Sequence, residues 1–225
     1  MVSSRAIGLS PAEVERLVRD VLIRHLPNEG GRREGPSELV VNISARHVHL
    51  SPRDLETLFG PGHKLTLDRP LYQEGEFAAA ETLAVVGPRR RMLPDVRVLG
   101  PCREYTQVEL AFTDGISLGL DLPVRRSGDH RQTPGCVLMG PQGVVELTSG
   151  VLRAQRHVHL NDRDAAWYDV GDGDRMKLRV ESSCPMLLDE LVVRCDPRYK
   201  LEVHLDTDEG NACDLTNATK VELLV

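Results

Sequence analysis

Short runs of apolar residues alternate with polar and turn-forming residues from residue 39 to the C-terminus. Gly, Pro, Asp or Asn separate many of these runs. Short runs bounded by such residues are typical of β-strands, and a long series of them favours a barrel or a sandwich over alternating strands and helices. We expect strands at Leu39–Ser44, Thr82–Val86, Val96–Leu99, Thr106–Phe112, Val137–Met139, Val144–Leu147, Arg175–Val180, Leu191–Cys195 and Leu201–Leu205.

Two short helices are predicted where a capping residue precedes a pair of apolar residues. Ser51 and Pro52 begin a segment that reaches Leu58, and Asn161 begins one that reaches Trp167. Ser and Asn side chains accept hydrogen bonds from the free N–H groups at the start of a helix, so both segments carry a start signal.

A longer amphipathic helix is predicted near the N-terminus. Ser10 and Glu13 form a capping box with Pro11 at the first helical position. Apolar residues then recur at helical spacing, at Val14, Leu17, Val18, Val21, Leu22 and Leu26. Pro27–Pro36 contains no apolar residue, which is typical of a linker. The helix either docks on the core or, as the linker favours, binds a partner surface.

One five-residue motif occurs twice. Arg46–Leu50 recurs letter for letter as Arg156–Leu160, and each copy is followed by a predicted capped helix and a Gly-containing turn. The repeat predicts two related halves.

Each copy of the motif contains a His-x-His pair. Residues i and i+2 of a strand point to the same face, so His47 and His49 project together, as do His157 and His159. Two imidazoles placed in this way can chelate one metal ion. A single pair is weak evidence, because many such pairs are surface or hydrogen-bonded histidines. Two identical copies favour metal binding.

Further ligands are expected on other strands. His204 lies in an alternating segment and would complete a three-histidine set with the second pair. Glu109 lies in another predicted strand, where it either binds metal or faces solvent. His25, His63 and His130 are expected to be solvated. Imidazole and carboxylate ligands suit Zn²⁺.

Composition narrows the function. The chain has 225 residues, enough for one or two domains, and its formal net charge of −6 argues against sequence-independent nucleic-acid binding. We expect no membrane span and no secretory signal. Five scattered cysteines indicate reduced thiols in the cytosol. Arg supplies nearly all the positive charge, which is compatible with a local pocket for a phosphorylated small molecule.

A collinear set of motifs extends over about residues 39–215. It comprises Ser44–Ser51, Phe59–Gly62, Gly75–Ala79, Val96–Pro101, Thr106–Glu109, Pro123–Arg125, Ser127–Asp129, Arg156–Leu160 and His204–Glu209. This set resembles the PduL-type phosphate propanoyltransferases, the phosphotransacylases of bacterial microcompartments. The resemblance implies reversible conversion of acyl-CoA, typically propanoyl-CoA, and phosphate into acyl phosphate and CoA.

The resemblance also implies the site. Two Zn²⁺ ions would be held, one by His47, His49 and Glu109 and the other by His157, His159 and His204. Arg103 matches the residue expected to hold phosphate. The positions that would contact coenzyme A are Ser44, Arg69, Arg97, Leu99, His204 and Asn211.

The implied fold is mainly β, with two closed antiparallel β-barrels and short flanking helices. Residues 39–46 and 155–225 would form the first barrel, and residues 47–154 the second. Residues 1–27 would be an amphipathic encapsulation helix and residues 28–38 a flexible linker.

The resemblance places the enzyme in the bacterial cytoplasm, inside a microcompartment, and associates it with propanediol degradation. Shell or lumen proteins would bind the N-terminal helix. The enzyme would be a homodimer or a larger homo-oligomer, and neither nucleic acid nor a membrane is an expected partner.

Two departures from the family pattern bear on the site. Arg69 stands where a Lys is frequent, and Gly210–Asp214 differs from the usual loop sequence, although Asn211 is retained. The first departure keeps the charge but changes the geometry.

The hypothesis is direct attack by phosphate, with no protein nucleophile. Cys102, next to Arg103, would be the nucleophile of the covalent alternative. A binuclear zinc hydrolase of phosphoesters or amides could use the same ligands. A cupin oxygenase also has His-x-His, but its Glu normally follows within a few residues. A non-enzymatic adaptor with structural zinc sites is a further alternative.

Overall fold

The computed structural model describes Val14, Val18 and residues 35–225. The chain divides between Gly35 and Pro36, and Pro36–Val225 is the unit that holds the fold described below. Apart from Val14 and Val18, the predicted N-terminal helix lies outside the described residues, as does most of the predicted linker.

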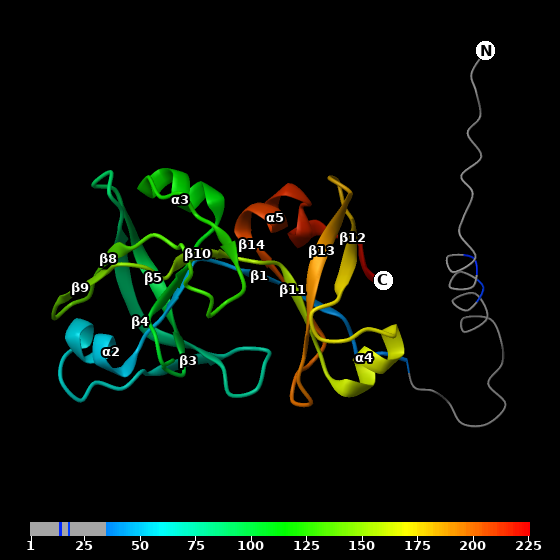
Figure 1. Ribbon diagram of the computed structural model, residues 1–225, viewed down its shortest axis with the longest axis horizontal. Coiled ribbons are helices and arrows are strands. Elements are labelled where there is room, and N and C mark those ends of the chain that lie inside the picture. The colour runs from blue at the N-terminus through cyan, green and yellow to red at the C-terminus, as the bar shows by residue number, and fades with distance from the viewer. Residues whose placement is uncertain (1–13, 15–17, 19–34) are drawn as a thin grey trace, which may run out of the picture. The chain divides into compact units, whose positions relative to one another are not determined.

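The second unit consists mainly of two curled β-sheets (Figure 1). The strands of the first sheet, in spatial order, are β1 (Val40–Ser44), β14 (Glu202–Asp206), β11 (His157–Leu160), β13 (Met186–Cys195), β12 (Arg175–Glu181) and β15 (Lys220–Leu224).

The second sheet has nine strands. In spatial order they are β7 (Val124–Arg125), β10 (Val151–Ala154), β6 (Gln107–Glu109), β2 (His47–His49), β5 (Met92–Gly100), β4 (Phe77–Val86), β8 (Cys136–Met139) and β9 (Val144–Leu147), while β3 (Leu67–Pro70) pairs with β4.

The prediction of a mainly β protein is confirmed, but the prediction of closed antiparallel barrels is wrong. Each sheet is open, because its two terminal strands do not pair with each other. Several neighbours are also parallel, including β2 with β5 and β11 with β13. The chain passes to the other sheet between β1 and β2 and again between β10 and β11. Such crossings produce pairs that no hairpin joins, and these pairs need not be antiparallel.

The two sheets repeat one strand order. The order β1-β14-β11-β13-β12-β15 corresponds to β10-β6-β2-β5-β4-β8, with the same parallel or antiparallel sense at each step. The repeated sequence motif therefore marks equivalent strands, β2 and β11. The strand that precedes each motif belongs to the opposite sheet.

Both predicted short helices form. In α2 (Pro52–Phe59), the Ser51 side chain accepts a hydrogen bond from the Asp54 N–H, and in α4 (Asp162–Tyr168), Asn161 does the same for Asp164. The unpredicted helical elements are α3 (Phe112–Leu118), α5 (Thr207–Ala212) and the short 3₁₀ segment η1 (Leu215–Asn217).

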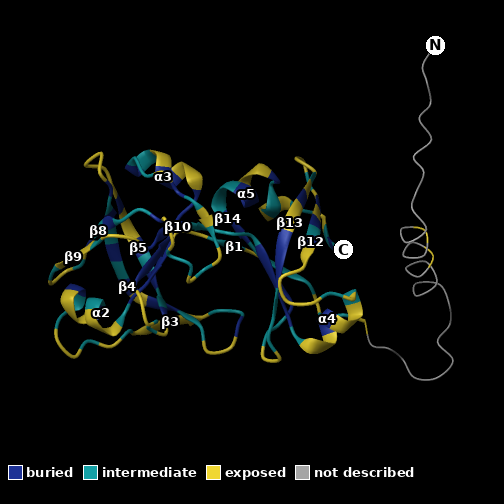
Figure 2. Ribbon diagram, in the orientation of Figure 1, coloured by how far each residue is buried: buried dark blue, intermediate teal, exposed yellow. Residues whose placement is uncertain are grey.

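Each sheet has its own apolar core (Figure 2). Val48 and Leu50 of one motif are fully buried in the first core, and Val158 and Leu160 of the other are fully buried in the second. Because successive side chains of a strand point to opposite faces, the histidines that flank these valines lie on the other face.

Direct contacts join the two sheets. The Gln73 side chain, between β3 and β4, donates a hydrogen bond to Lys200 O and accepts one from Lys200 N. Arg153 of β10 forms an ion pair with Asp206 of β14. The division of residues 39–225 into two domains stays a prediction.

Candidate metal centres and anion site

Strand register sets the third residue of each histidine cluster. β2 runs antiparallel to β6 and pairs His47 with Glu109. β11 runs antiparallel to β14 and pairs His157 with His204. Glu109 and His204 therefore occupy equivalent positions in the two sheets.

The first cluster comprises His47, His49 and Glu109. All three residues are buried, and their candidate ligand atoms lie within 4.8 Å of one another. His47 Nδ1 is 2.8 Å from Ala45 O, so it carries the proton and Nε2 keeps its lone pair. His47 Nε2 lies 3.5 Å from a Glu109 carboxylate oxygen. His49 Nδ1 is buried and has no hydrogen-bond partner among the described residues.

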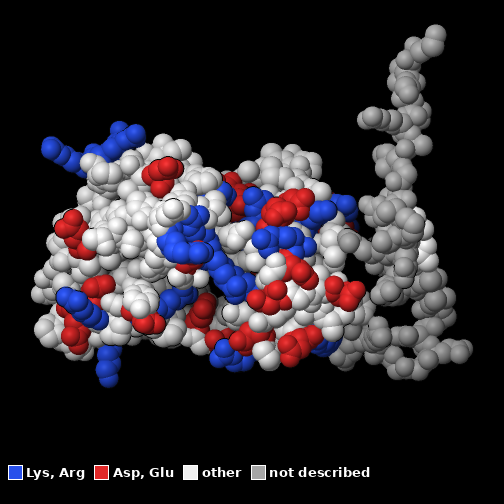
Figure 3. Space-filling view, in the orientation of Figure 1, with Lys and Arg blue, Asp and Glu red and all other residues white. Residues whose placement is uncertain are grey.

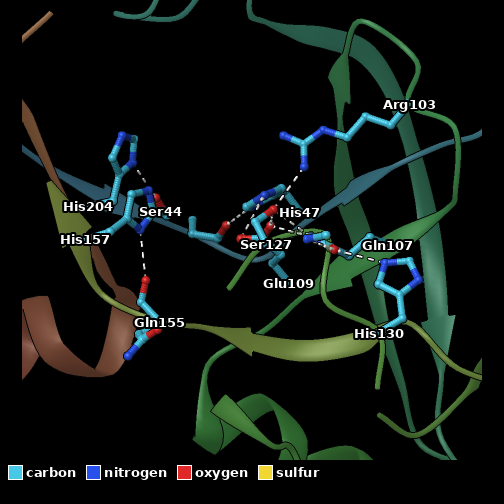
Figure 4. Close-up of polar contacts among 12 residues, drawn as sticks. Ser44, His47, Arg103, Gln107, Glu109, Ser127, His130, Gln155, His157 and His204 are labelled. Carbon is cyan, nitrogen blue, oxygen red and sulfur yellow. Dashed lines mark hydrogen bonds and ion pairs between the residues drawn. The ribbon is translucent and has the colours of Figure 1, made fainter. Parts of the chain in front are cut away.

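The second cluster comprises His157, His159 and His204, with ligand atoms also within 4.8 Å of one another. His157 Nδ1 is 2.8 Å from Gln155 O, and the buried His159 Nδ1 has no hydrogen-bond partner in the described part of the chain. The rings of His157 and His204 stack at 4.7 Å. His204 Nδ1 lies 3.1 Å from the Ser44 hydroxyl, as Figure 4 shows.

Burial favours the neutral form of three of these imidazoles, those of His49, His157 and His159. It lowers the pKa of His49 well below the usual value, with further lowering by the charges of His47 and Arg103. Burial, followed by neighbouring positive groups, has the same effect on the pKa of His157 and lowers that of His159 to about 3. Neutral imidazole is the form that binds metal.

Glu109 is the negative group of the first cluster. Burial alone would raise its pKa, but the charges of His47 and His49 and the hydrogen bond from Ser127 outweigh burial and lower the pKa to about 2. The carboxylate is therefore ionised at neutral pH, as a metal ligand must be.

The donor sets fit a zinc-like ion. Both clusters offer imidazole nitrogens, and the first adds a carboxylate. Among the described residues, the first contains one buried nitrogen without a hydrogen-bond partner (His49 Nδ1) and the second contains two (His159 Nδ1 and His204 Nε2). Burying such a nitrogen costs free energy, which a bound cation would offset. Three such ligands around an open position are typical of catalytic zinc sites.

Arg103 is connected to the first cluster. Its guanidinium donates a hydrogen bond of 3.0 Å to the Ser127 hydroxyl, which donates one of 2.7 Å to Glu109 Oε1 (Figure 4). The Arg103 backbone N–H is anchored on Leu50 O, directly after the His-x-His strand.

Gln107 and His130 form a hydrogen-bonded chain that ends at Glu109. The sequence did not predict a role for either residue. Gln107 Nε2 donates to Glu109 Oε1 at 2.6 Å, and Gln107 Oε1 lies 3.0 Å from His130 Nε2. The expectation that His63 and His130 are solvated is wrong, because both residues are half-buried, with His63 bonded to Glu81 and His130 bonded to Gln107. The position of Gln107, two residues before Glu109 on one strand face, was the available signal.

Arg194 was also missed. It lies on β13 opposite His159, its Nε is buried, and no described residue forms a hydrogen bond with that nitrogen. Burial and then the nearby Arg126 lower its pKa to about 10, although Glu109 opposes the shift. Figure 3 shows Lys and Arg side chains gathered along the middle of the face in view. An Arg inside the apolar run Leu191–Cys195 was the sequence signal.

The residues expected to contact coenzyme A do not all lie together. Ser44 contacts His204. Arg97 and Leu99 lie on β5, opposite His47 and His49. Arg69 and Asn211 are exposed, and neither forms a hydrogen bond or ion pair with a cluster residue among the described residues. The coenzyme roles stay predictions.

All five cysteines are free thiols. Cys102 is half-buried, and burial raises its pKa. A raised pKa leaves less of the nucleophilic thiolate at neutral pH, which disfavours a covalent step at Cys102.

Two buried clusters of metal-binding side chains, one of them linked to an arginine, define a candidate metalloenzyme for an anionic substrate. The chain belongs to the phosphate propanoyltransferase family, which matches residues 40–216. The resemblance found in the sequence is therefore confirmed. Among the described residues, no helix has the length and apolar character needed to span a membrane.

Three relatives cover most of the chain. A phosphate propanoyltransferase of Planctopirus limnophila is 59% identical over 96% of this chain and 92% of its own length. Those of Thermotoga maritima and Enterococcus faecalis are 46% and 41% identical over 83% and 82% of this chain, and over 89% and 87% of their own lengths. These relatives support a phosphotransacylase, and hence an acyltransferase, role.

Proposed function

We propose that the chain is a zinc-dependent phosphotransacylase that interconverts acyl-CoA and phosphate with acyl phosphate and CoA, with propanoyl-CoA as the typical acyl donor. The single observation that carries the proposal is the pair of equivalent clusters with Arg103 hydrogen-bonded into the first. The relatives are named phosphate propanoyltransferases, and this name supports phosphate and an acyl-CoA as the substrates.

Each residue has a chemical role in this proposal. His47, His49 and Glu109 hold one zinc ion, and His157, His159 and His204 hold the other. Bound zinc supplies Lewis acidity toward the thioester carbonyl and stabilises the thiolate of CoA. The remaining chemistry belongs to side chains that bind and orient the substrates.

Arg103 binds phosphate through two parallel N–H···O bonds and directs one phosphate oxygen at the thioester carbonyl carbon. The new O–C bond forms as the C–S bond breaks, and CoA leaves as the thiolate. Arg194, whose charge also influences the two clusters, approaches the same region from the other sheet and adds positive charge for the anion. No protein nucleophile is needed.

Coenzyme A contacts Ser44, Arg69, Arg97, Leu99, His204 and Asn211 in this proposal. The two sheets act as two domains, residues 39–46 with 155–225 and residues 47–154. Residues 1–27 target the enzyme to shell or lumen proteins of a microcompartment in the bacterial cytoplasm, and the enzyme is a homodimer or larger homo-oligomer.

The test combines metal analysis with a phosphate-dependent assay of CoA release. The purified enzyme should contain about two zinc ions per chain and should release free thiol from propanoyl-CoA only when phosphate is present. Thiol release by water alone would instead support the hydrolase alternative, which the relatives do not favour.

Substitution separates the direct and covalent routes. Cys102→Ala should keep most of the activity, whereas Arg103→Ala should lose it and raise the apparent KM for phosphate. Arg91→Ala, which removes an exposed Arg from the β4–β5 hairpin, is the matched control. Loss of activity in Cys102→Ala would overturn direct attack.

A further inference from the structure

One position differs in an informative way between the two equivalent centres. Two residues before the third ligand, β6 carries Gln107 and β14 carries Glu202. Gln107 pairs with His49 in strand register, and Glu202 pairs with His159. These two residues are therefore structural equivalents, and each reaches along its strand to the third ligand.

The chemical types are exchanged between the centres. In the first, the ligand Glu109 is a carboxylate and its neighbour Gln107 is an amide, joined at 2.6 Å. In the second, the ligand His204 is an imidazole and its neighbour Glu202 is a carboxylate, with Oε2 3.1 Å from His204 Nε2. Each centre thus holds one carboxylate, as a direct ligand in the first and behind the ligand in the second.

Glu202 is firmly held. It is only 2% exposed, and its two oxygens accept hydrogen bonds from Asn42 Nδ2 at 2.5 Å and Gln73 Nε2 at 2.6 Å. The same Gln73 amide is fixed by both backbone polar groups of Lys200, so its position does not depend on Glu202 alone.

The basic side chain within ion-pair distance of the Glu202 carboxylate is that of His204. A buried carboxylate without a cation is costly. The side of the Glu202 carboxylate that faces His204 is where a balancing positive charge would lie. A cation bound by His204 would supply that charge.

We propose that Glu202 is a positioning residue that accepts the Nε2 proton of His204 and thereby directs the Nδ1 lone pair toward the cation held with His157 and His159. The proposal rests on the proposed metal centres. His204 Nε2 lies 3.1 Å from Glu202 Oε2 but forms no hydrogen bond with a described residue, so the proposal requires a small rotation of the His204 ring. Ser44 fits this tautomer, because its hydroxyl can donate to Nδ1 when no metal is bound.

The first test measures zinc affinity by competition with a chromophoric chelator. Glu202→Gln keeps the shape of the side chain but removes its charge. It should lower the affinity for one of the two zinc ions by roughly 10- to 100-fold and leave the affinity for the other unchanged. Glu146→Gln is the matched control, since it alters an exposed strand carboxylate on β9 and should leave both ions in place. Circular dichroism verifies that each variant is folded.

A second variant keeps the test decisive if Glu202→Gln does not fold. Gln73→Leu leaves the Glu202 carboxylate in place but removes one of its hydrogen-bond donors. It should lower the affinity for the same zinc ion by a smaller factor. Wild-type affinity for both ions in either folded variant would overturn the proposal.

A second readout needs no metal. In metal-free protein with ¹⁵N-labelled histidine, the His204 ring should be protonated at Nε2, and Glu202→Gln should shift it toward a mixture of tautomers. A wild-type ring protonated at Nδ1 would overturn the proposal. A wild-type protein that binds no zinc would overturn the proposed function and this inference together, whereas unaltered zinc binding and tautomer in Glu202→Gln would overturn this inference alone.

Discussion

The first histidine of each motif is held by the backbone immediately before it. His47 Nδ1 contacts Ala45 O and His157 Nδ1 contacts Gln155 O, both at 2.8 Å. The carbonyl can only accept, so both rings carry their proton at Nδ1 and offer Nε2. The backbone before each copy of the motif therefore fixes the orientation of its first imidazole ring.

Ser127 connects Arg103, the proposed phosphate-binding residue, with Glu109 of the first cluster. Its loss should therefore weaken phosphate binding more than metal binding. In Ser127→Ala, Arg103 loses an acceptor and Glu109 loses a donor. We expect the KM for phosphate to rise roughly tenfold, as for one lost hydrogen bond to a charged group, while the zinc content stays the same. Steady-state kinetics and metal analysis measure the two effects, and an unchanged KM would contradict the assignment.

Glu81 should make stability depend on pH. Burial alone would raise its pKa, but hydrogen bonds from the Thr66 N–H and the contact with His63 outweigh burial and lower the pKa below 4.5. A lowered folded-state pKa means that the ionised carboxylate stabilises the fold above pH 4.5, and this contribution disappears as the pH falls through the folded-state value.

Glu81→Gln should therefore lower the free energy of unfolding at pH 7, and its difference from the wild type should shrink below pH 4.5. Urea denaturation at a series of pH values measures this difference. A difference that stays constant down to pH 3 would refute the role of ionisation.

At the level of residues, the sequence predicted groups whose chemistry appears in a motif. The His-x-His pairs, Glu109 and His204 lie together because strand periodicity and register determine their faces. Arg194 and Glu202 were not predicted, because their importance comes from strands that are distant in sequence.

The elements show where local signals suffice. Helices α2 and α4 were predicted because Ser51 and Asn161 are side-chain caps. Helix α5 was missed, although Asp206 and Glu209 form a capping box that the sequence displays. The N-cap residue of helix α3 is Ala111, which offers no side-chain hydrogen bond, so the apolar run through Phe112 was interpreted as a strand. The parallel pairs could not be predicted, because no local pattern encodes the pairing of strands that are distant in sequence.

Helix α5 packs closely on β1 at Gly210. A Cβ added there would lie 2.5 Å from Ile43 Cδ1, which is too close for a van der Waals contact. Gly210→Ala should therefore destabilise the protein even though Ala favours helix. In an Ile43→Ala background the same substitution should cost much less. A double-mutant cycle by urea denaturation measures this coupling, and additive effects would exclude the predicted clash.

On the scale of the whole molecule, both clusters and all proposed coenzyme contacts lie within the unit Pro36–Val225. Deleting residues 1–33 should therefore leave phosphate-dependent CoA release within about twofold of the full chain, since every proposed catalytic residue is retained. Co-purification with shell proteins should change instead. A collapse of turnover in a deletion variant that remains folded would show that the N-terminal segment belongs to the catalytic unit.

The exchange of β1 and β10 between the sheets also bears on the origin of the chain. A half-length polypeptide with one His-x-His motif would lack one strand of its own sheet. Two copies could complete their sheets only as a symmetric dimer in which each copy contributes its first strand to the sheet of the other. The two centres of such a pair would be identical. In a single chain that contains both halves the two centres need not be identical, and here one carries Glu109 where the other carries His204.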